Sequence, residues 1–201
     1  HRIGHATTTL IKSDGALLLV DPSLPPELMG ARLDERWGVQ LSDVTHVFLT
    51  SFDPDRRRTL QGLVHATWLM HELEIHSAAT AIQDELERAE NDPEVVNILN
   101  EHLGLLANFT VPNDKPFSCV DLFPTPGFTL GSCGLLLPMP ERTILITGDT
   151  VATQEHLEMG SVLQTCASVE LAKESFLECV EIADIIIPGR DNVILNTNRS
   201  Q

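Results

Sequence analysis

Charged side chains follow directly after four apolar segments of this sequence. In proteins built on sheets, functional side chains collect on the loops at strand ends. Carboxylates gathered there can hold a hard cation through oxygen, and an arginine can pair with a carboxylate or an anion. A single aspartate would be ordinary turn chemistry, because Asp bonds its own backbone in loops. Recurrence at several strand ends indicates a site, and the side chains concerned are Asp21, Asp53, Asp55, Asp149 and Arg190.

The elements that would position these side chains are short apolar segments separated by turn residues. Residues 13–15, Ser-Asp-Gly, form a turn sequence between two apolar runs and predict a hairpin. Strands are predicted at residues 10–12, 17–20, 45–50, 67–70, 109–111, 119–123, 134–137, 143–147 and 185–187.

Longer helices are expected between and after these strands. A capping box at Thr80 predicts a helix that runs to about Asn91. Asp92, followed by proline, predicts the start of the next helix. Residues 24–38 predict a proline-rich loop with a short helix, and residues 168–182 a further helix. The inward side chains of that last helix are expected to be Leu171, Phe176, Leu177 and Val180. Sheet layers covered by helices are the architecture that this order favours.

Composition limits the class of protein. A chain of 201 residues with 42% hydrophobic residues predicts one globular domain, residues 1–201. A formal charge of −16 argues against nucleic acid and anionic membranes as partners, since both attract basic surfaces. No apolar run approaches the roughly 20 residues that span a bilayer, and no signal-peptide core precedes the first strand. Four widely spaced cysteines are typical of reduced thiols, so a cytoplasmic location is expected.

Several segments, in the same order along the chain, resemble motifs of the metallo-β-lactamase superfamily. Residues 125–132 read T-P-G-F-T-L-G-S, which is similar to the family's T-P-G-H-T-P-G-S. The other matching segments are residues 4–7, 19–22, 47–50, 146–149 and 187–190. The resemblance implies an α/β protein with the four-layer αβ/βα sandwich of this superfamily.

The family's metal ligands are largely replaced. Where the family has H-x-H-x-D-H, residues 51–56 read S-F-D-P-D-R, so only Asp55 matches. Phe128 and Arg190 stand at the two later histidine positions, and Asp149 keeps the bridging aspartate. The resemblance thus implies a former metal pocket of Ser51, Asp53, Asp55, Arg56, Phe128, Asp149 and Arg190, with His5 and Asp21 as neighbours.

These replacements are unfavourable for zinc. Phenylalanine offers no lone pair, and arginine carries a permanent positive charge that cannot accept a metal bond. Three aspartates and two arginines, in contrast, leave a charge near −1 without any metal. We therefore expect Arg190 and Arg56 to pair with Asp55 or Asp149. The alternative is drift, in which the site is lost and its exposed residues have simply changed.

Two functions follow from this comparison. The first is a noncatalytic or noncanonical binding or scaffold protein, a pseudoenzyme without cofactor, whose partner is a small molecule or a protein. The second is a metal-dependent hydrolase of ester, thioester or lactam bonds, in which Asp53, Asp55 and Asp149 hold one divalent ion through oxygen. A homo-oligomer is compatible with either function.

Overall fold

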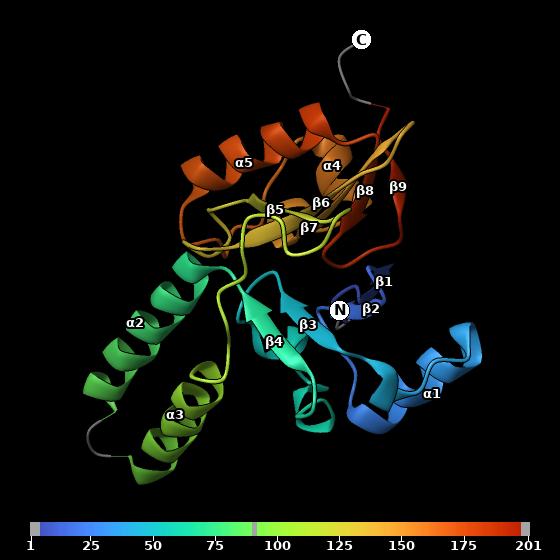
Figure 1. Cartoon of the computed structure of the whole chain (residues 1–201). Coiled ribbons are helices and arrows are strands. Elements are labelled where there is room, and N and C mark those ends of the chain that lie inside the picture. Colours follow the sequence, from blue (N-terminus) through green and yellow to red (C-terminus); the bar gives the residue numbers. More distant parts are fainter. Residues whose placement is uncertain (1–4, 90–91, 198–201) are drawn as a thin grey trace.

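The computed structural model describes residues 5–89 and 92–197. Two sheets stack face to face, and helices cover the outer face of each sheet, so the chain forms four layers (Figure 1). The strands are β1 (Thr9–Ser13), β2 (Ala16–Val20), β3 (His46–Leu49), β4 (Thr67–Met70), β5 (Asp121–Pro124), β6 (Cys133–Pro138), β7 (Thr143–Gly148), β8 (Ile185–Pro188) and β9 (Ile194–Leu195). The helices are α1 (Pro26–Trp37), α2 (Glu72–Arg88), α3 (Pro93–Leu106), α4 (Gln154–Met159) and α5 (Val169–Ile182).

Each half of the chain builds its own sheet. The first sheet has the order β1-β2-β3-β4, and the second has the order β5-β6-β7-β8-β9. The predicted hairpin of β1 and β2 is confirmed, and its turn residues Asp14 and Gly15 both have positive φ, at 52° and 77°. Parallel pairing of β2 with β3 and of β7 with β8 brings the carboxyl ends of these strands to one edge in each sheet.

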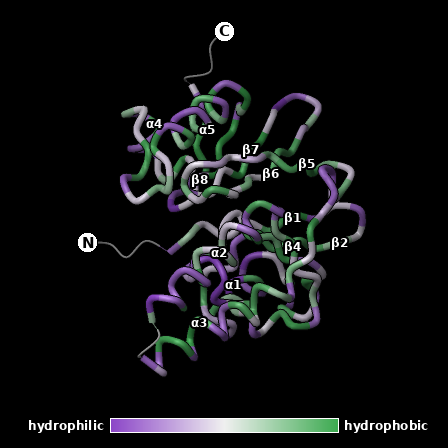
Figure 2. Tube along the Cα trace, turned by 90° about the vertical axis from the view of Figure 1, so that its left-hand side faces the viewer, coloured by the Kyte–Doolittle hydropathy of each residue, from purple (hydrophilic) through white to green (hydrophobic). Residues whose placement is uncertain are grey.

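The core has three parts, one at each interface between neighbouring layers. Apolar residues between the sheets include Val20, Phe48 and Leu135, all fully buried. A second cluster joins the first sheet to α1, α2 and α3, and a third joins the second sheet to α4 and α5. Hydrophobic stretches of the trace run through the strands in the middle of the molecule and also through parts of α3 and α5 (Figure 2). Within the described residues, no helix combines the length and apolar character that crossing a membrane requires.

Two of the predicted helix starts are confirmed by their caps. The Asp92 carboxylate accepts bonds from the backbone N–H groups of Glu94 and Val95, which begins α3. Ser168 caps α5 in the same way through the N–H of Leu171. The first residue of the matching segment 4–7 and the expected helix end at Asn91 lie outside the described residues.

Other local predictions were wrong. The helix expected from Thr80 begins at Glu72, because the Thr80 hydroxyl donates to the His76 carbonyl, 3.0 Å away within the helix, and caps nothing. The helix in residues 24–38 is not short, since α1 has 12 residues. Residues 109–111 form only an isolated bridge, from Thr110 to Leu69.

The inward face of α5 also differs from the prediction. Leu177 is 64% exposed and Leu171 is 38% exposed. Phe176 is buried as predicted, and Val180 packs partly buried against the same cluster. Ala172 and Cys179 are buried beside Phe176, and their spacing of four and three places the three residues on one helical face. The inward face of α5 thus combines one large aromatic residue with the small residues Ala172 and Cys179.

Candidate functional site

The site lies where the carboxyl ends of strands from both sheets meet. Asp21 ends β2, Asp55 and Arg56 belong to a 3-10 turn after β3, Asp149 follows β7 and Arg190 follows β8. The strand ends that the sequence pointed to are therefore brought together across the two sheets. A backbone bond from the Cys133 N–H to the Thr50 carbonyl, 3.0 Å long, joins the sheets beside this group.

Arg56 is the centre of the group and is fully buried, with 0% exposure. Its Nη1 lies 2.6 Å from Oδ2 of Asp21, and its Nη2 lies 2.6 Å from Oδ1 of Asp149. A buried guanidinium must be paired, because removing a charge from water is costly. Arg56 therefore links a carboxylate of the first sheet to a carboxylate of the second.

Asp21 is held in place from a second direction. Its two carboxylate oxygens accept bonds from the N–H and the hydroxyl of Thr50, at 2.8 and 2.7 Å. Its backbone is in the left-handed region, with φ 49°, which a residue other than glycine adopts only under constraint. Burial raises the pKa of Asp21, and Arg56 and Thr50 offset part of that effect. Asp21, expected only as a neighbour of the pocket, is thus a direct ion-pair partner of Arg56.

Arg190 forms the second bridge. Its Nε and Nη2 donate to the two oxygens of Asp149, at 3.0 and 2.7 Å, and its Nη1 donates to Oδ2 of Asp55 at 2.6 Å. The fork geometry of the guanidinium suits such two-point contacts. The expected pairing of both arginines with these carboxylates is present. Gly189 allows the close approach, since a Cβ there would lie 2.3 Å from Oδ1 of Asp149.

Charges control ionisation in this group. Burial alone would raise the pKa of Asp149, but Arg56 and Arg190 outweigh it and hold that pKa below the ordinary value of 3.8. The pKa of Arg190 is raised because its carboxylate partners outweigh the effect of burial. Both arginines and Asp149 are therefore ionised at neutral pH.

Asp53, Ser51 and Phe128 do not join this network. Asp53 is half-buried and makes no ion pair or side-chain hydrogen bond with any residue that the structure describes. Burial, followed by repulsion from Asp55, raises its pKa. The Ser51 hydroxyl is buried and has no hydrogen-bond partner within residues 5–89 and 92–197. Asp53 thus lies within the electrostatic reach of Asp55, Asp149 and both arginines, but Asp21 and not Asp53 forms the ion pair with Arg56.

Asp53 and Phe128 instead line a cleft of about 500 Å³ beside the network. The cleft is bounded by the loop after β3, by α2 and α3, and by the loops at residues 128–130 and 165–167. Glu74 of α2 is buried at this cleft and is a residue that sequence reasoning missed. Its carboxylate accepts bonds from the Phe52 N–H at 2.7 Å and from the Thr129 hydroxyl at 2.6 Å. Glu74 precedes the predicted start of the helix at Thr80, so the sequence carried no signal for its position.

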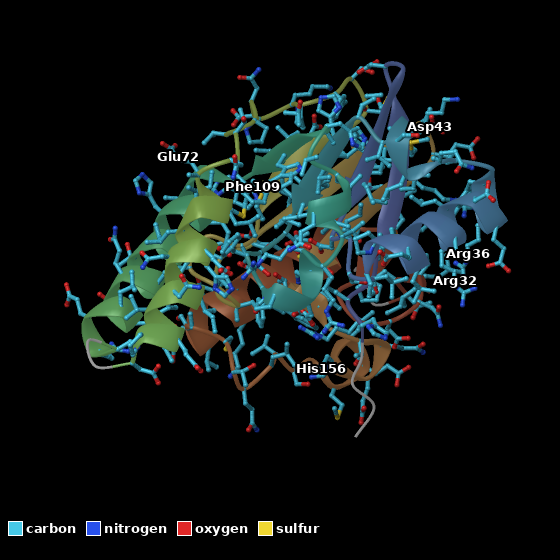
Figure 3. The ribbon with its side chains drawn as sticks, turned by 90° about the horizontal axis from the view of Figure 1, so that it is seen from below. Arg32, Arg36, Asp43, Glu72, Phe109 and His156 are labelled. Carbon is cyan, nitrogen blue, oxygen red and sulfur yellow. The ribbon has the colours of Figure 1, made fainter. Side chains whose placement is uncertain are left out.

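His5 was expected beside the pocket, and the structure places it elsewhere. It lines a separate hollow of about 210 Å³ together with Arg32 and Arg36 of α1. Arg32 and Arg36 lie side by side on α1, across the molecule from α2 and α3 (Figure 3). The sequence around His5 does not show toward which side of the fold its side chain points.

The donor set does not fit the dinuclear zinc centre that the fold family implies. Two of the former histidine positions hold guanidinium groups, and both contact the remaining carboxylates at 2.6 Å. Placing zinc there would require the metal to displace these cations from Asp55 and Asp149. Among the described residues, no three His, Cys, Asp or Glu side chains gather closely enough to hold a metal ion.

The comparisons with known proteins identify the family. The family model described as the metallo-β-lactamase superfamily matches residues 2–189, so the chain belongs to this superfamily. No curated protein matches the sequence. The predicted α/β fold with two sheets and covering helices is confirmed.

Solved structures share the fold at low sequence identity. AidC, a dizinc quorum-quenching lactonase, has a TM-score of 0.72 and 15% identity, with 94% of this chain and 74% of that chain covered. The hydrolase AbOPH has a TM-score of 0.71 and 15% identity, with 95% and 76% covered. A metallo-β-lactamase candidate from Thermotoga maritima has a TM-score of 0.69 and 17% identity, with 94% and 88% covered. At these identities the likeness concerns the fold alone.

Proposed function

We propose that this protein is a noncatalytic binding member of the metallo-β-lactamase superfamily, in which a network of arginines and aspartates replaces the dinuclear metal centre. The observation that carries the proposal is the position of Arg56. Its guanidinium lies 2.6 Å from Asp21 and 2.6 Å from Asp149, with no exposure to solvent. A permanent cation at that point supplies the positive charge that carboxylates of a metal site otherwise obtain from the ion.

The network also accounts for the retained aspartates without catalysis. Asp149 is bound by both arginines, and Asp55 is bound by Arg190. Carboxylates left unpaired in such a place would destabilise the fold, so their pairing gives them a structural role. Drift of an abandoned site predicts arginines turned to solvent, and that expectation is not met at Arg56 or Arg190.

Metal analysis tests this proposal. Protein purified without chelator, and a second sample incubated with zinc and then desalted, are measured by elemental mass spectrometry. We expect well under one zinc per chain in both samples. The matched positive control is a variant with histidine restored at the five family positions, Ser51, Asp53, Arg56, Phe128 and Arg190, and it is expected to gain zinc. Stoichiometric zinc in the wild type, lost on Asp149→Ala, would overturn the proposal.

A metal-dependent hydrolase is the second candidate, and the similar structures favour it. Two of the solved proteins with this fold are described as a dizinc lactonase and as an N-acyl homoserine lactone lactonase. Asp53, Asp55 and Asp149 would be its ligands, but Asp55 and Asp149 are engaged by Arg190. Assays with an ester, a thioester, a β-lactam and an acyl homoserine lactone, each with added Mg²⁺, Mn²⁺ or Zn²⁺, separate the two. Turnover that disappears in Asp149→Ala supports the hydrolase.

A further inference from the structure

The cleft beside the arginine–aspartate network carries one unbalanced carboxylate. Asp21, Asp53, Asp55 and Asp149 lie around two guanidinium groups, those of Arg56 and Arg190. The two arginines make all their ion pairs with Asp21, Asp55 and Asp149. Asp53 makes no ion pair with either arginine; burial and the charges of Asp55 and Asp149 disfavour its ionised form, and the longer-range attraction of Arg56 and Arg190 offsets only part of this effect.

Arg57 also lines the cleft, and its position is fixed by contacts with Phe52. Its Nε donates to the Phe52 carbonyl at 3.2 Å, and its guanidinium lies 4.2 Å from the centre of the Phe52 ring. Arg57 attracts Asp53 at longer range but forms no ion pair with it in the part of the chain that the structure describes. A half-buried carboxylate without a partner is unfavourable, so Asp53 is a site where a cation from outside would be stabilised.

The other charged side chains of the cleft are also mainly acidic. Its other acidic residues are Glu74 and Glu85, and its basic side chains are Arg57 and His102. Glu85 is exposed at the rim, whereas the Glu74 carboxylate is already bonded to Phe52 and Thr129. An anionic ligand would meet this acidic excess, in a chain whose formal charge is −16.

Apolar side chains form the remainder of the wall. Phe128, Ile82 and Leu130 line the cleft together with small residues of α2, Ala78 and Ala81. A volume of about 500 Å³ lies within the range of small-molecule sites. The wall therefore suits a ligand with an apolar body and one positively charged end.

We propose that this cleft binds a small organic cation, with an ammonium or guanidinium group against Asp53 and an apolar body along Phe128 and α2. This inference rests on the proposed function, because it takes the neighbouring carboxylates to be neutralised by arginine rather than by metal. Phe128 then has a positive role, since it supplies apolar wall at a position where the family has a histidine.

The test uses three probes that share one apolar body: 4-phenylbutylammonium, 4-phenylbutan-1-ol and 4-phenylbutanoate. Binding to the full chain is measured by isothermal titration calorimetry and by ligand-observed NMR at neutral pH and low salt. We expect the ammonium probe to bind about tenfold or more tightly than the other two, as a charge-assisted hydrogen bond predicts. Asp53→Asn is expected to remove this preference.

Matched variants make the outcome specific. Asp84→Asn, an exposed carboxylate of α2 that does not line the cleft, should leave all three affinities unchanged. Phe128→Ala should weaken all three probes while the ammonium preference remains. Equal binding of the probes, tighter binding of 4-phenylbutanoate, or an ammonium preference that survives Asp53→Asn would overturn the inference. A zinc-free protein with any of these results would still satisfy the proposed function, whereas stoichiometric zinc would refute that function first.

Discussion

Replacing Arg56 by methionine tests the role of the charge network most directly. Arg56→Met keeps a similar side-chain length but leaves Asp21, 1% exposed, without a cation in contact among residues 5–89 and 92–197. Removing one partner of a buried ion pair costs about 3–5 kcal/mol, because the remaining charge stays desolvated. Domains are stable by about 5–15 kcal/mol, so the variant should lose a large part of its free energy of unfolding.

Urea unfolding followed by circular dichroism measures this loss. With a slope of about 2–3 kcal/mol per molar urea, the midpoint should fall by roughly 1–2 M. Arg58→Met is the control, since Arg58 is exposed in the same loop, and a surface change of this kind stays within about 0.5 kcal/mol. The double variant Arg56→Met with Asp21→Asn should recover part of the stability, because the stranded charge is then absent. An Arg56→Met protein within about 1 kcal/mol of the wild type would refute the reasoning.

Three further changes test other parts of the structure. Asp149→Asn should destabilise the protein most near neutral pH, and the stability difference from the wild type should shrink as pH falls below 3.8. The reason is that two guanidinium groups hold the pKa of Asp149 in the folded protein under that ordinary value despite burial. Urea midpoints from pH 7 to pH 3 measure the difference, and a constant difference would contradict the prediction. Gly189→Ala should cost about 1–3 kcal/mol by thermal unfolding, because its Cβ would lie 2.3 Å from Oδ1 of Asp149, whereas Gly104→Ala in α3 meets nothing within 4 Å and should be neutral or stabilising. Asp92→Ala should cost about 1 kcal/mol through loss of the α3 cap, and unchanged stability would show that the cap is dispensable.

The sequence predicted the strands better than the helices. Apolar runs bounded by turn residues located β2, β4, β7 and β8, because a buried strand must be apolar along most of its length. The start of α2 at Glu72 was missed because no side chain caps it. The capping-box pattern at Thr80, eight residues later, gave the stronger helix signal in the sequence. α4 was missed because it has only 6 residues, fewer than periodicity requires.

The sequence predicted which residues form the site, but it did not predict which arginine pairs with which aspartate. Family motifs placed Asp55, Asp149 and Arg190 near one another, since they follow strands that end at a common edge. The sequence could not show that Asp21 rather than Asp53 faces Arg56. That choice depends on the left-handed backbone of Asp21 and on its bonds to Thr50, which are tertiary contacts.

Ion pairs in the network divide evenly between the two halves of the chain. Arg56 with Asp21 lies entirely in the first half, and Arg190 with Asp149 entirely in the second. The contacts of Arg56 with Asp149 and of Asp55 with Arg190 cross between the halves. During synthesis on the ribosome, the first half can thus neutralise its own buried carboxylate before the second half exists. A cut between β4 and β5 would therefore leave one matched pair in each fragment and would divide the other two pairs between the fragments.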